Sequence, residues 1–190
     1  MKKIIILSAI LFSISCTSKS QETDHSKQEQ KTTEKKQIVS NKETNGITVV
    51  DETYTLDVYI ETSAENINYL VMTMNPSEGS YFISPLSKAG FKGSFKYGFG
   101  ETKNIDFFGE VTETPSAFKH VNMSPYDNTI EEGRVYEKTV YKQALTVKSI
   151  TDFETMGKVE FTIELRCTYE IIPFKITLEN GVFKITEAKC

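Results

Sequence analysis

The sequence has few of the residues that build metal centres and catalytic triads. Its 190 residues include two histidines and three cysteines, and no tryptophan. His25 and His120 each stand without a second ligand or catalytic motif nearby, so we expect neither a metal site nor a Ser/His/Asp or Cys/His arrangement. No Gly-x-Gly-x-x-Gly motif occurs, which leaves a phosphate-cradling loop of that kind unsupported. The composition predicts a protein without a cofactor and favours a binding module over an enzyme.

The net charge of the chain is small. The chain has 22 Lys and Arg residues against 26 Asp and Glu residues, which gives a formal net charge of −4 at pH 7. Proteins that bind nucleic acid or an acidic membrane surface through their overall electrostatic field carry a clear positive excess. We therefore expect no nucleic-acid partner.

A membrane-spanning apolar segment is also missing. Ile4–Ile14 is an apolar run of eleven residues, whereas a membrane-spanning helix needs about 20. Two lysines precede the run and Ser13-Ile14-Ser15-Cys16 ends it, an order that indicates a signal peptide. This order resembles the lipobox of bacterial lipoproteins; a secretory signal followed by a chance cysteine is the alternative. The resemblance implies a signal peptide over residues 1–15, a lipid on Cys16, and a lipoprotein of the cell envelope, expected at the outer membrane and facing the periplasm or the cell surface.

The next segment is polar throughout. Residues 17–45 are mainly Ser, Thr, Lys, Glu and Gln. Such a segment buries too little apolar surface to offset the entropy lost on ordering. We therefore expect residues 16–45 to form a flexible tether, and residues 46–190, a usual length for one domain, to form a single folded unit.

Alternating apolar and polar residues predict strands over the rest of the chain. The alternation is clear over Tyr54–Ile60 and Val159–Leu165, and a near-continuous apolar run over Ile67–Met74 indicates a strand buried on both faces. Short strands with turns between them, and no convincing amphipathic helix, predict an all-β fold: an antiparallel immunoglobulin-like β-sandwich, with a closed barrel as the alternative. Other strands are expected at residues 81–83, 105–111, 135–141 and 144–150, with a turn over residues 151–157.

The C-terminal part carries the strongest local signal. Asn180-Gly181 is a pair typical of two-residue β-hairpin turns, and alternating apolar residues flank it. A turn at this pair places Leu178 opposite Phe183 and Ile176 opposite Ile185, so that the large apolar side chains share one face. The sequence therefore predicts a hairpin in this register.

A glycine- and aromatic-rich stretch runs from Leu86 to Phe108. One interpretation is an apolar groove for a peptide or a lipid-like ligand. The other is a pair of β-strands whose aromatic side chains fill the core and whose glycines mark bulges or turns. The candidate apolar binding surface consists of Tyr81, Phe91, Phe95, Tyr97 and Phe99.

The last third of the chain carries a second resemblance. Gly157–Phe174 resembles the end of the periplasmic N-terminal domain of thiol:disulfide interchange proteins (the DsbD family), in which a strand delivers a first cysteine and a second cysteine follows beside a proline. Cys167 matches the first cysteine, whereas Ile171, Ile172 and Pro173 stand where the second would be. The resemblance implies an immunoglobulin-like sandwich and thiol exchange with periplasmic partners.

Two cysteines remain once Cys16 is assigned to a lipid. If Asn180-Gly181 closes the hairpin, position 190 lies across from Ile171, near Cys167, so Cys167 and Cys190 are a candidate disulfide or redox pair in an oxidising compartment. The alternative is a buried Cys167 and a frayed terminal Cys190. The function expected first is a lipid-anchored module that binds an envelope protein or peptide; the alternative is thiol–disulfide exchange through Cys167 and Cys190.

Overall fold

The computed structural model describes residues 36–87, 91–100, 102–117 and 133–189. Within these ranges the protein contains strands, turns and loops but no helix, and so none with the length and hydrophobicity to cross a bilayer. The strands are β1 (Gln37–Asn41), β2 (Gly46–Val50), β3 (Tyr54–Thr62), β4 (Asn68–Pro76), β5 (Phe82–Ile83), β6 (Lys96–Phe99), β7 (Ile105–Thr114), β8 (Arg134–Val135), β9 (Thr139–Val147), β10 (Phe153–Ile163), β11 (Thr168–Glu179) and β12 (Val182–Glu187).

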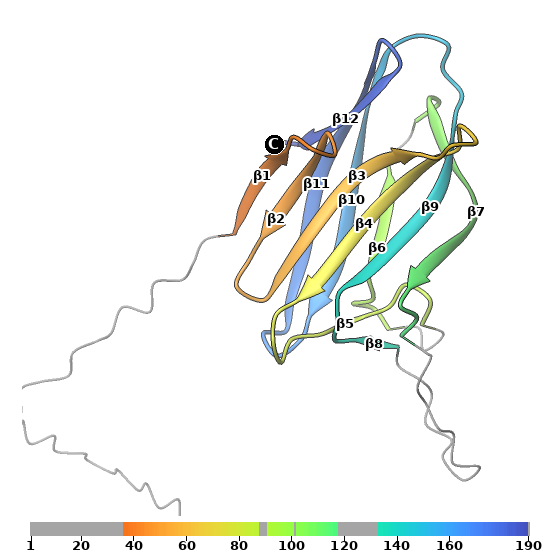
Figure 1. Cartoon of the computed structure of the whole chain (residues 1–190). Coiled ribbons are helices and arrows are strands. Elements are labelled where there is room, and N and C mark those ends of the chain that lie inside the picture. The colour runs from red at the N-terminus through yellow and green to blue at the C-terminus, as the bar shows by residue number, and fades with distance from the viewer. Residues whose placement is uncertain (1–35, 88–90, 101, 118–132, 190) are drawn as a thin grey trace, which may run out of the picture. The chain divides into compact units, whose positions relative to one another are not determined.

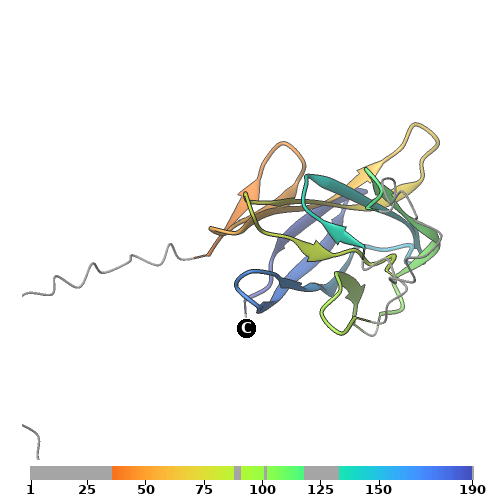
Figure 2. The same cartoon turned by 90° about the horizontal axis from the view of Figure 1, so that it is seen from below.

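Two antiparallel sheets pack face to face (Figure 1). The first sheet has the strand order β1-β2-β3-β4-β9-β7, and the second has the order β12-β11-β10-β6. The short β5–β8 pair lies at the lower end of the sandwich in Figure 1. From below, the two sheets appear as separate layers (Figure 2). The predicted antiparallel β-sandwich is confirmed.

The two long sides of the sandwich differ. On one side β12 lies beside the β1–β2 turn, where the Ile185 N–H donates to the Asn45 carbonyl at 2.7 Å. On the other side β6 and β7 are the edge strands of their sheets and do not pair with each other. The described strands therefore do not form a closed barrel.

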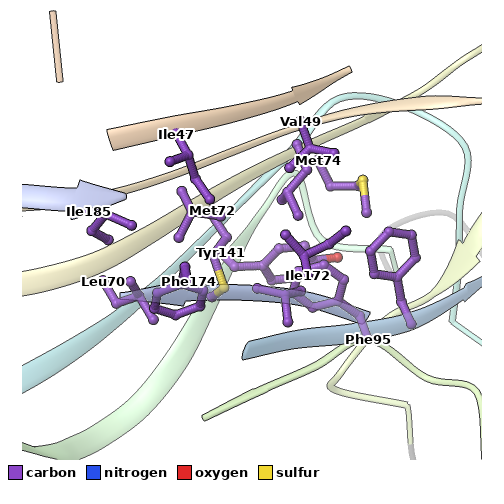
Figure 3. Packing of buried hydrophobic residues seen from close by; sticks show 14 of the residues in the cluster. Ile47, Val49, Leu70, Met72, Met74, Phe95, Tyr141, Ile172, Phe174 and Ile185 are labelled. Carbon is purple, nitrogen blue, oxygen red and sulfur yellow. The ribbon is translucent and has the colours of Figure 1, made fainter. Parts of the chain in front are cut away.

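The core lies between the sheets because inward-facing positions on both are apolar. Side chains of the first sheet, such as Ile47 and Met72, meet Ile172 and Phe174 of the second (Figure 3). Burying each large side chain of this kind contributes on the order of 2 kcal/mol. Phe95 stacks within this core, 5.0 Å from the Tyr141 ring and 5.7 Å from the Phe161 ring (centroid distances).

The C-terminal hairpin has the predicted register. Leu178 pairs with Phe183 and Ile176 with Ile185. Asn180 and Gly181 adopt φ values of 50° and 77°, the left-handed region that a two-residue type I′ turn requires at both positions. The alternating apolar residues and the Asn-Gly pair were therefore sufficient to predict this hairpin.

The strand expected at residues 67–74 is also confirmed: Val71 on the outer face of β4 is as buried as its inner-face neighbours.

β9 joins parts of two strands that the sequence predicted separately, at residues 135–141 and 144–150. β9 runs from Thr139 to Val147 without the break expected between residues 141 and 144, because the Gln143 side chain is buried and hydrogen-bonded within the sheet. The turn expected over residues 151–157 is wrong, since β10 already starts at Phe153. Gly157 marks close packing within this strand: a Cβ there would lie 2.5 Å from the Phe174 ring.

The folded unit starts earlier than composition indicated. β1 (Gln37–Asn41) pairs with β2 along its full length, so the boundary expected at residue 46 is wrong. A strand added at a sheet edge is held mainly by backbone hydrogen bonds and needs little apolar pattern; here Ile38 alone packs on the core. The rest of the predicted tether, with Cys16 and the predicted signal peptide, lies outside the described residues.

Candidate functional site

The five aromatic residues proposed as one surface occupy different places. Phe95 has no exposed surface and belongs to the core. Phe91 is exposed in the loop before β6, and Tyr81 lies at the end of the sandwich beside the β5–β8 pair. Tyr97 and Phe99 are both half-buried on β6 and do share a site.

An open cleft of about 400 Å³ lies between β6 and β7. Phe107 of β7 packs against both β6 rings, with its centroid 5.6 Å from that of Tyr97 and 4.6 Å from that of Phe99. The volume falls within the range of about 300–1,000 Å³ typical of ligand sites, and an aromatic lining is also typical. We call this site the β6–β7 cleft; it is lined by Tyr97, Gly98, Phe99, Gly100, Thr102, Ile105, Asp106 and Phe107.

The β6 side of the cleft presents unpaired backbone groups. Beyond the end of β6, the Gly100 N–H donates to the Met156 carbonyl of β10. Hydrogen-bonded pairs alternate along an antiparallel ladder, so Gly98 and Lys96 are the β6 residues that exchange hydrogen bonds with β10. The N–H and C=O groups of Tyr97 and Phe99 consequently point away from β10 and towards the open side.

The β7 side shows the same arrangement over its first residues. The Lys148 N–H donates to the Asn104 carbonyl, so by alternation Asp106 exchanges hydrogen bonds with β9. The backbone groups of Ile105 and Phe107 therefore point outward, towards the cleft. No described residue forms a hydrogen bond with these outward groups of either strand.

A buried glutamine fixes the shape of β7 next to the cleft. The pairing of β7 with β9 is interrupted between Phe108 and Thr112 by a bulge. The Gln143 amide donates to the carbonyls of Phe108 at 3.0 Å and Gly109 at 2.8 Å, and accepts from the Tyr97 hydroxyl at 3.1 Å. Burial raises the pKa of Tyr97 to about 12, so its hydroxyl remains a donor at neutral pH. Gln143 thus connects the edge strands of both sheets.

A second polar network lies at the end of the sandwich where the chain enters the fold. Arg166, in the β10–β11 turn, binds Asp51 at 3.0 Å and Glu170 at 2.9 Å. Glu170 also accepts from Lys36 at 2.8 Å and from the Tyr54 hydroxyl at 3.3 Å. The network connects the β2–β3 turn, the β10–β11 turn and the start of β1.

Within this network, Asp51 is held in its charged form. Burial alone would raise the pKa of Asp51, but hydrogen bonds from Thr53 and Arg166 outweigh it and hold the pKa below its ordinary value. Burial, followed by the charge of Glu170, raises the pKa of Tyr54, which keeps this hydroxyl neutral. Every group has a partner, and the arrangement is that of a structural anchor.

Cys167 is exposed, not buried as one of the two expectations had it. It is the one cysteine among the described residues and lies at the end of the β10–β11 turn. A hydrogen bond to Glu164, with Sγ 3.5 Å from the carboxylate, and the charge of that carboxylate raise the pKa of the thiol. Exchange reactions need the thiolate, so this environment lowers reactivity. Cys190 lies outside the described residues, and its pairing with Cys167 stays a prediction.

A buried serine near the lower end has no access to a substrate. The Ser84 hydroxyl donates to Glu113 and accepts from the Leu86 N–H at 3.0 Å. Ser84 has no exposed surface, and Tyr141 behind it has a pKa raised by burial. These contacts hold the loops around β5 in place.

No group of His, Cys, Asp and Glu side chains within the described ranges could hold a metal ion. Comparisons of the chain with protein families, with characterised proteins and with solved structures find no match. The geometry described above is therefore the basis for any functional argument.

Two of the cleft's features were not expected from the sequence. Phe107 was recognised as aromatic but not as part of a site, because its contact with β6 spans two sheets. In the sequence Gln143 was interpreted as part of a break between two strands. Its hydrogen bonds to the Phe108 and Gly109 carbonyls show that it supports the β7 bulge. The one indication in the sequence was that Gln143, a polar residue, stands at a position where the alternating pattern calls for an apolar side chain.

Proposed function

We propose that this protein is a binding module that takes an extended polypeptide segment of a partner along the outer edge of β6. The observation that carries the proposal is the outward orientation of the Tyr97 and Phe99 backbone groups beside an aromatic cleft. An added strand would pair with these groups and place alternate side chains against the rings, the mode of recognition called β-augmentation.

The two edges of the cleft differ in how well they suit an added strand. At Gly98 of β6 the outer face of the sheet is open, since no heavy atom lies within 4 Å of the position where a Cβ would point. The β7 edge is less suited, because its bulge between Phe108 and Thr112 interrupts the ladder, and bulges are a common device against pairing at exposed edges. We therefore assign the added strand to β6.

The location of the module follows from the N-terminal sequence. The proposal includes a lipid on Cys16 and residence in the cell envelope, because a basic n-region, an apolar run and a cysteine stand in lipobox order. From Cys16 to the start of the fold at Lys36 the chain has a root-mean-square reach on the order of 25 Å if flexible. Changing Cys16 to Ala should release the protein from the membrane fraction; unchanged partition would refute the anchor without affecting the cleft.

Thiol–disulfide exchange, the alternative drawn from the sequence, has no specific support among the described residues. Glu164 raises the pKa of the Cys167 thiol, whereas a redox-active cysteine has a lowered one. The surroundings of Cys167 therefore disfavour thiol exchange as the function.

The test is a comparison of two variants at one position. A random peptide library is selected on the immobilised full-length protein, and the enriched peptides are measured on Phe99→Ala and Phe99→Pro. Both variants remove the ring, but only proline removes the outward N–H, which β10 does not use. We expect Phe99→Pro to bind about fivefold more weakly than Phe99→Ala, the value of one hydrogen bond. Equal affinities, or no enriched peptides, would contradict strand addition at β6.

A further inference from the structure

The end of β6 is open on the outer face of its sheet. The rings of Tyr97 and Phe99 turn inward, so alternation puts Gly98 on the outer face. A Cβ at Gly98 would have no heavy atom within 4 Å, and one at Gly100 would meet only the Met156 carbonyl oxygen, at 3.9 Å. A strand added at this edge would therefore find no β6 side chain beside it at these two positions.

The next side chains across this open stretch belong to β10. Lys158 pairs with Gly98 in the ladder, and the Gly100 N–H donates to the Met156 carbonyl at 3.0 Å. The Lys158 ammonium binds Glu160 at 2.9 Å, on the side away from Met156. Met156 is 48% exposed. An apolar side chain thus faces solvent directly behind two glycines at the sheet edge.

A second pocket, of about 320 Å³, adjoins this methionine. Gly100, Glu154 and Met156 are among the residues that line it, and it shares Gly100 and Thr102 with the β6–β7 cleft. Two hollows therefore flank the end of β6, one beside the aromatic rings and one beside Met156. A segment bound along β6 would lie between them.

Pairing with β6 determines which side chains of such a segment face Met156. In an antiparallel ladder, hydrogen-bonded pairs alternate with non-hydrogen-bonded pairs, whose side chains lie closer together. The outward groups of Tyr97 and Phe99 would form the hydrogen bonds, so residues opposite Gly98 or Gly100 belong to non-hydrogen-bonded pairs and face outward. Two strand spacings, about 10 Å, separate the added strand from β10. A large side chain can cross the glycines and meet Met156 from the other side.

An aromatic ring fits these surroundings best. The thioether of a methionine makes favourable contacts with aromatic rings, and an aromatic residue beside an edge glycine stabilises strand pairing. The charged side chains that flank Met156 on this face are already paired, Lys158 with Glu160 and Lys175 with Glu154. A charged side chain on the added strand would meet both members of a pair and gain little.

We propose that the partner segment carries an aromatic residue on its outward face, whose ring lies across Gly98 and Gly100 and packs on Met156. This inference rests on the proposed strand addition at β6 and adds the class of segment that binds. Neighbouring side chains of a strand point to opposite faces. The segment therefore has an apolar residue facing the β6–β7 cleft and an aromatic residue directly beside it facing outward.

The test uses the peptides selected on the full-length protein and the variant Met156→Ala. We expect the enriched peptides to share an aromatic residue and to bind Met156→Ala about fivefold more weakly than wild type. Replacing that aromatic residue by alanine should weaken binding to wild type more than binding to Met156→Ala, because the two side chains contact each other. The matched control is Ile171→Ala: Ile171 is also 48% exposed, but it lies on β11, which β10 separates from β6.

Backbone N-methylation of the peptides checks the register. Methylating the aromatic residue should leave affinity nearly unchanged, because the N–H of a non-hydrogen-bonded pair points away from β6. Methylating its neighbours should weaken binding about fivefold, since at least one of them pairs with Phe99. Loss of binding on methylation of the aromatic residue itself would overturn the placement of its ring on the outer face.

Failure of this inference can be distinguished from failure of strand addition. Peptides that bind Phe99→Pro more weakly than Phe99→Ala, but share no aromatic residue or are unaffected by Met156→Ala, would overturn the contact with Met156 and leave strand addition supported. Equal losses on Met156→Ala and Ile171→Ala would also overturn it. Peptides that bind both Phe99 variants equally, or no enriched peptides, would contradict strand addition and this inference together.

Discussion

Single residues set the closest contacts of this sandwich, and Gly157 and Gln143 are the clearest cases. Gly157 allows the Phe174 ring to lie against β10, because no side chain larger than hydrogen fits between them. Gln143 satisfies two carbonyls that the β7 bulge releases from the ladder. Neither role can be read from the sequence alone, since each depends on a partner that lies far away along the chain.

Gly157→Ala should destabilise the domain. The added Cβ would lie 2.5 Å from the Phe174 ring, and relieving such overpacking costs about 1–3 kcal/mol. Gly98→Ala is the matched control, since Gly98 lies on the neighbouring strand with no heavy atom within 4 Å of the new Cβ. Urea unfolding of both variants would measure the difference; equal midpoints would show that the packing at Gly157 is looser than described.

Arg166→Met should destabilise the domain and change its response to acid. Removing the guanidinium leaves Asp51 and Glu170 without their main partner, at a cost on the order of 2 kcal/mol, since Arg166 is itself partly exposed. The pKa of Asp51 is lowered in the folded protein, so its contribution to stability is complete above the ordinary carboxyl pKa of about 4 and is lost as pH falls through the folded value.

The measurement for this prediction is urea unfolding of wild type and Arg166→Met at several pH values. The difference between the two proteins should be largest near neutral pH and smaller below about pH 4. A difference that stays constant across this range would show that Arg166 stabilises the fold through packing of its side chain and not through charge.

Among the elements, the C-terminal hairpin was predictable in full and the β10–β11 hairpin only in part. Asn180-Gly181 is a local signal, so turn and register follow from neighbouring residues. The turn from Glu164 to Cys167 has no such signal: leucine and cysteine give no indication of positive φ, and the alternation that predicted a strand through Leu165 continues past the end of β10 at Ile163. The long-range Arg166 network holds this turn, and it is not visible in the sequence.

Gly181→Val should destabilise the hairpin by about 1–3 kcal/mol, because a β-branched residue resists the φ of 77° found there. No heavy atom lies within 4 Å of the new Cβ, so the effect is confined to the backbone. Asn180→Gly is the control and should be nearly neutral, since glycine accepts the same conformation. A thermal midpoint of Gly181→Val equal to that of wild type would contradict a two-residue turn.

At the scale of the whole molecule, the class of fold was predictable and its N-terminal boundary was not. The antiparallel sandwich follows from alternation and turn spacing. β1 was not predicted from the sequence because residues 37–41 contain only two apolar residues. The strand is held instead by backbone pairing with β2 and by the Lys36–Glu170 ion pair. The β6–β7 cleft was anticipated through Tyr97 and Phe99, but its unpaired edges result from strand order, which the sequence does not specify.

A truncation series should locate the boundary. A chain that starts at Lys36 should be as stable as the full-length protein, whereas one that starts at Gly46 loses β1 and the ion pair of Lys36 with Glu170. Removing β1 also exposes the part of the core that the Ile38 side chain covers. We expect the shorter chain to unfold at a clearly lower temperature in calorimetry; equal melting temperatures would place the boundary at residue 46 after all.

Amide hydrogen exchange tests the central claim, strand addition at β6, most directly. In the free protein the amides of Tyr97 and Phe99 should exchange fast because they point away from β10, whereas those of Lys96 and Gly98 should be protected by their bonds to it. With a selected peptide bound, Tyr97 and Phe99 should become protected and the other two should stay unchanged. Protection that rises equally at all four residues, or at none, would contradict an added strand.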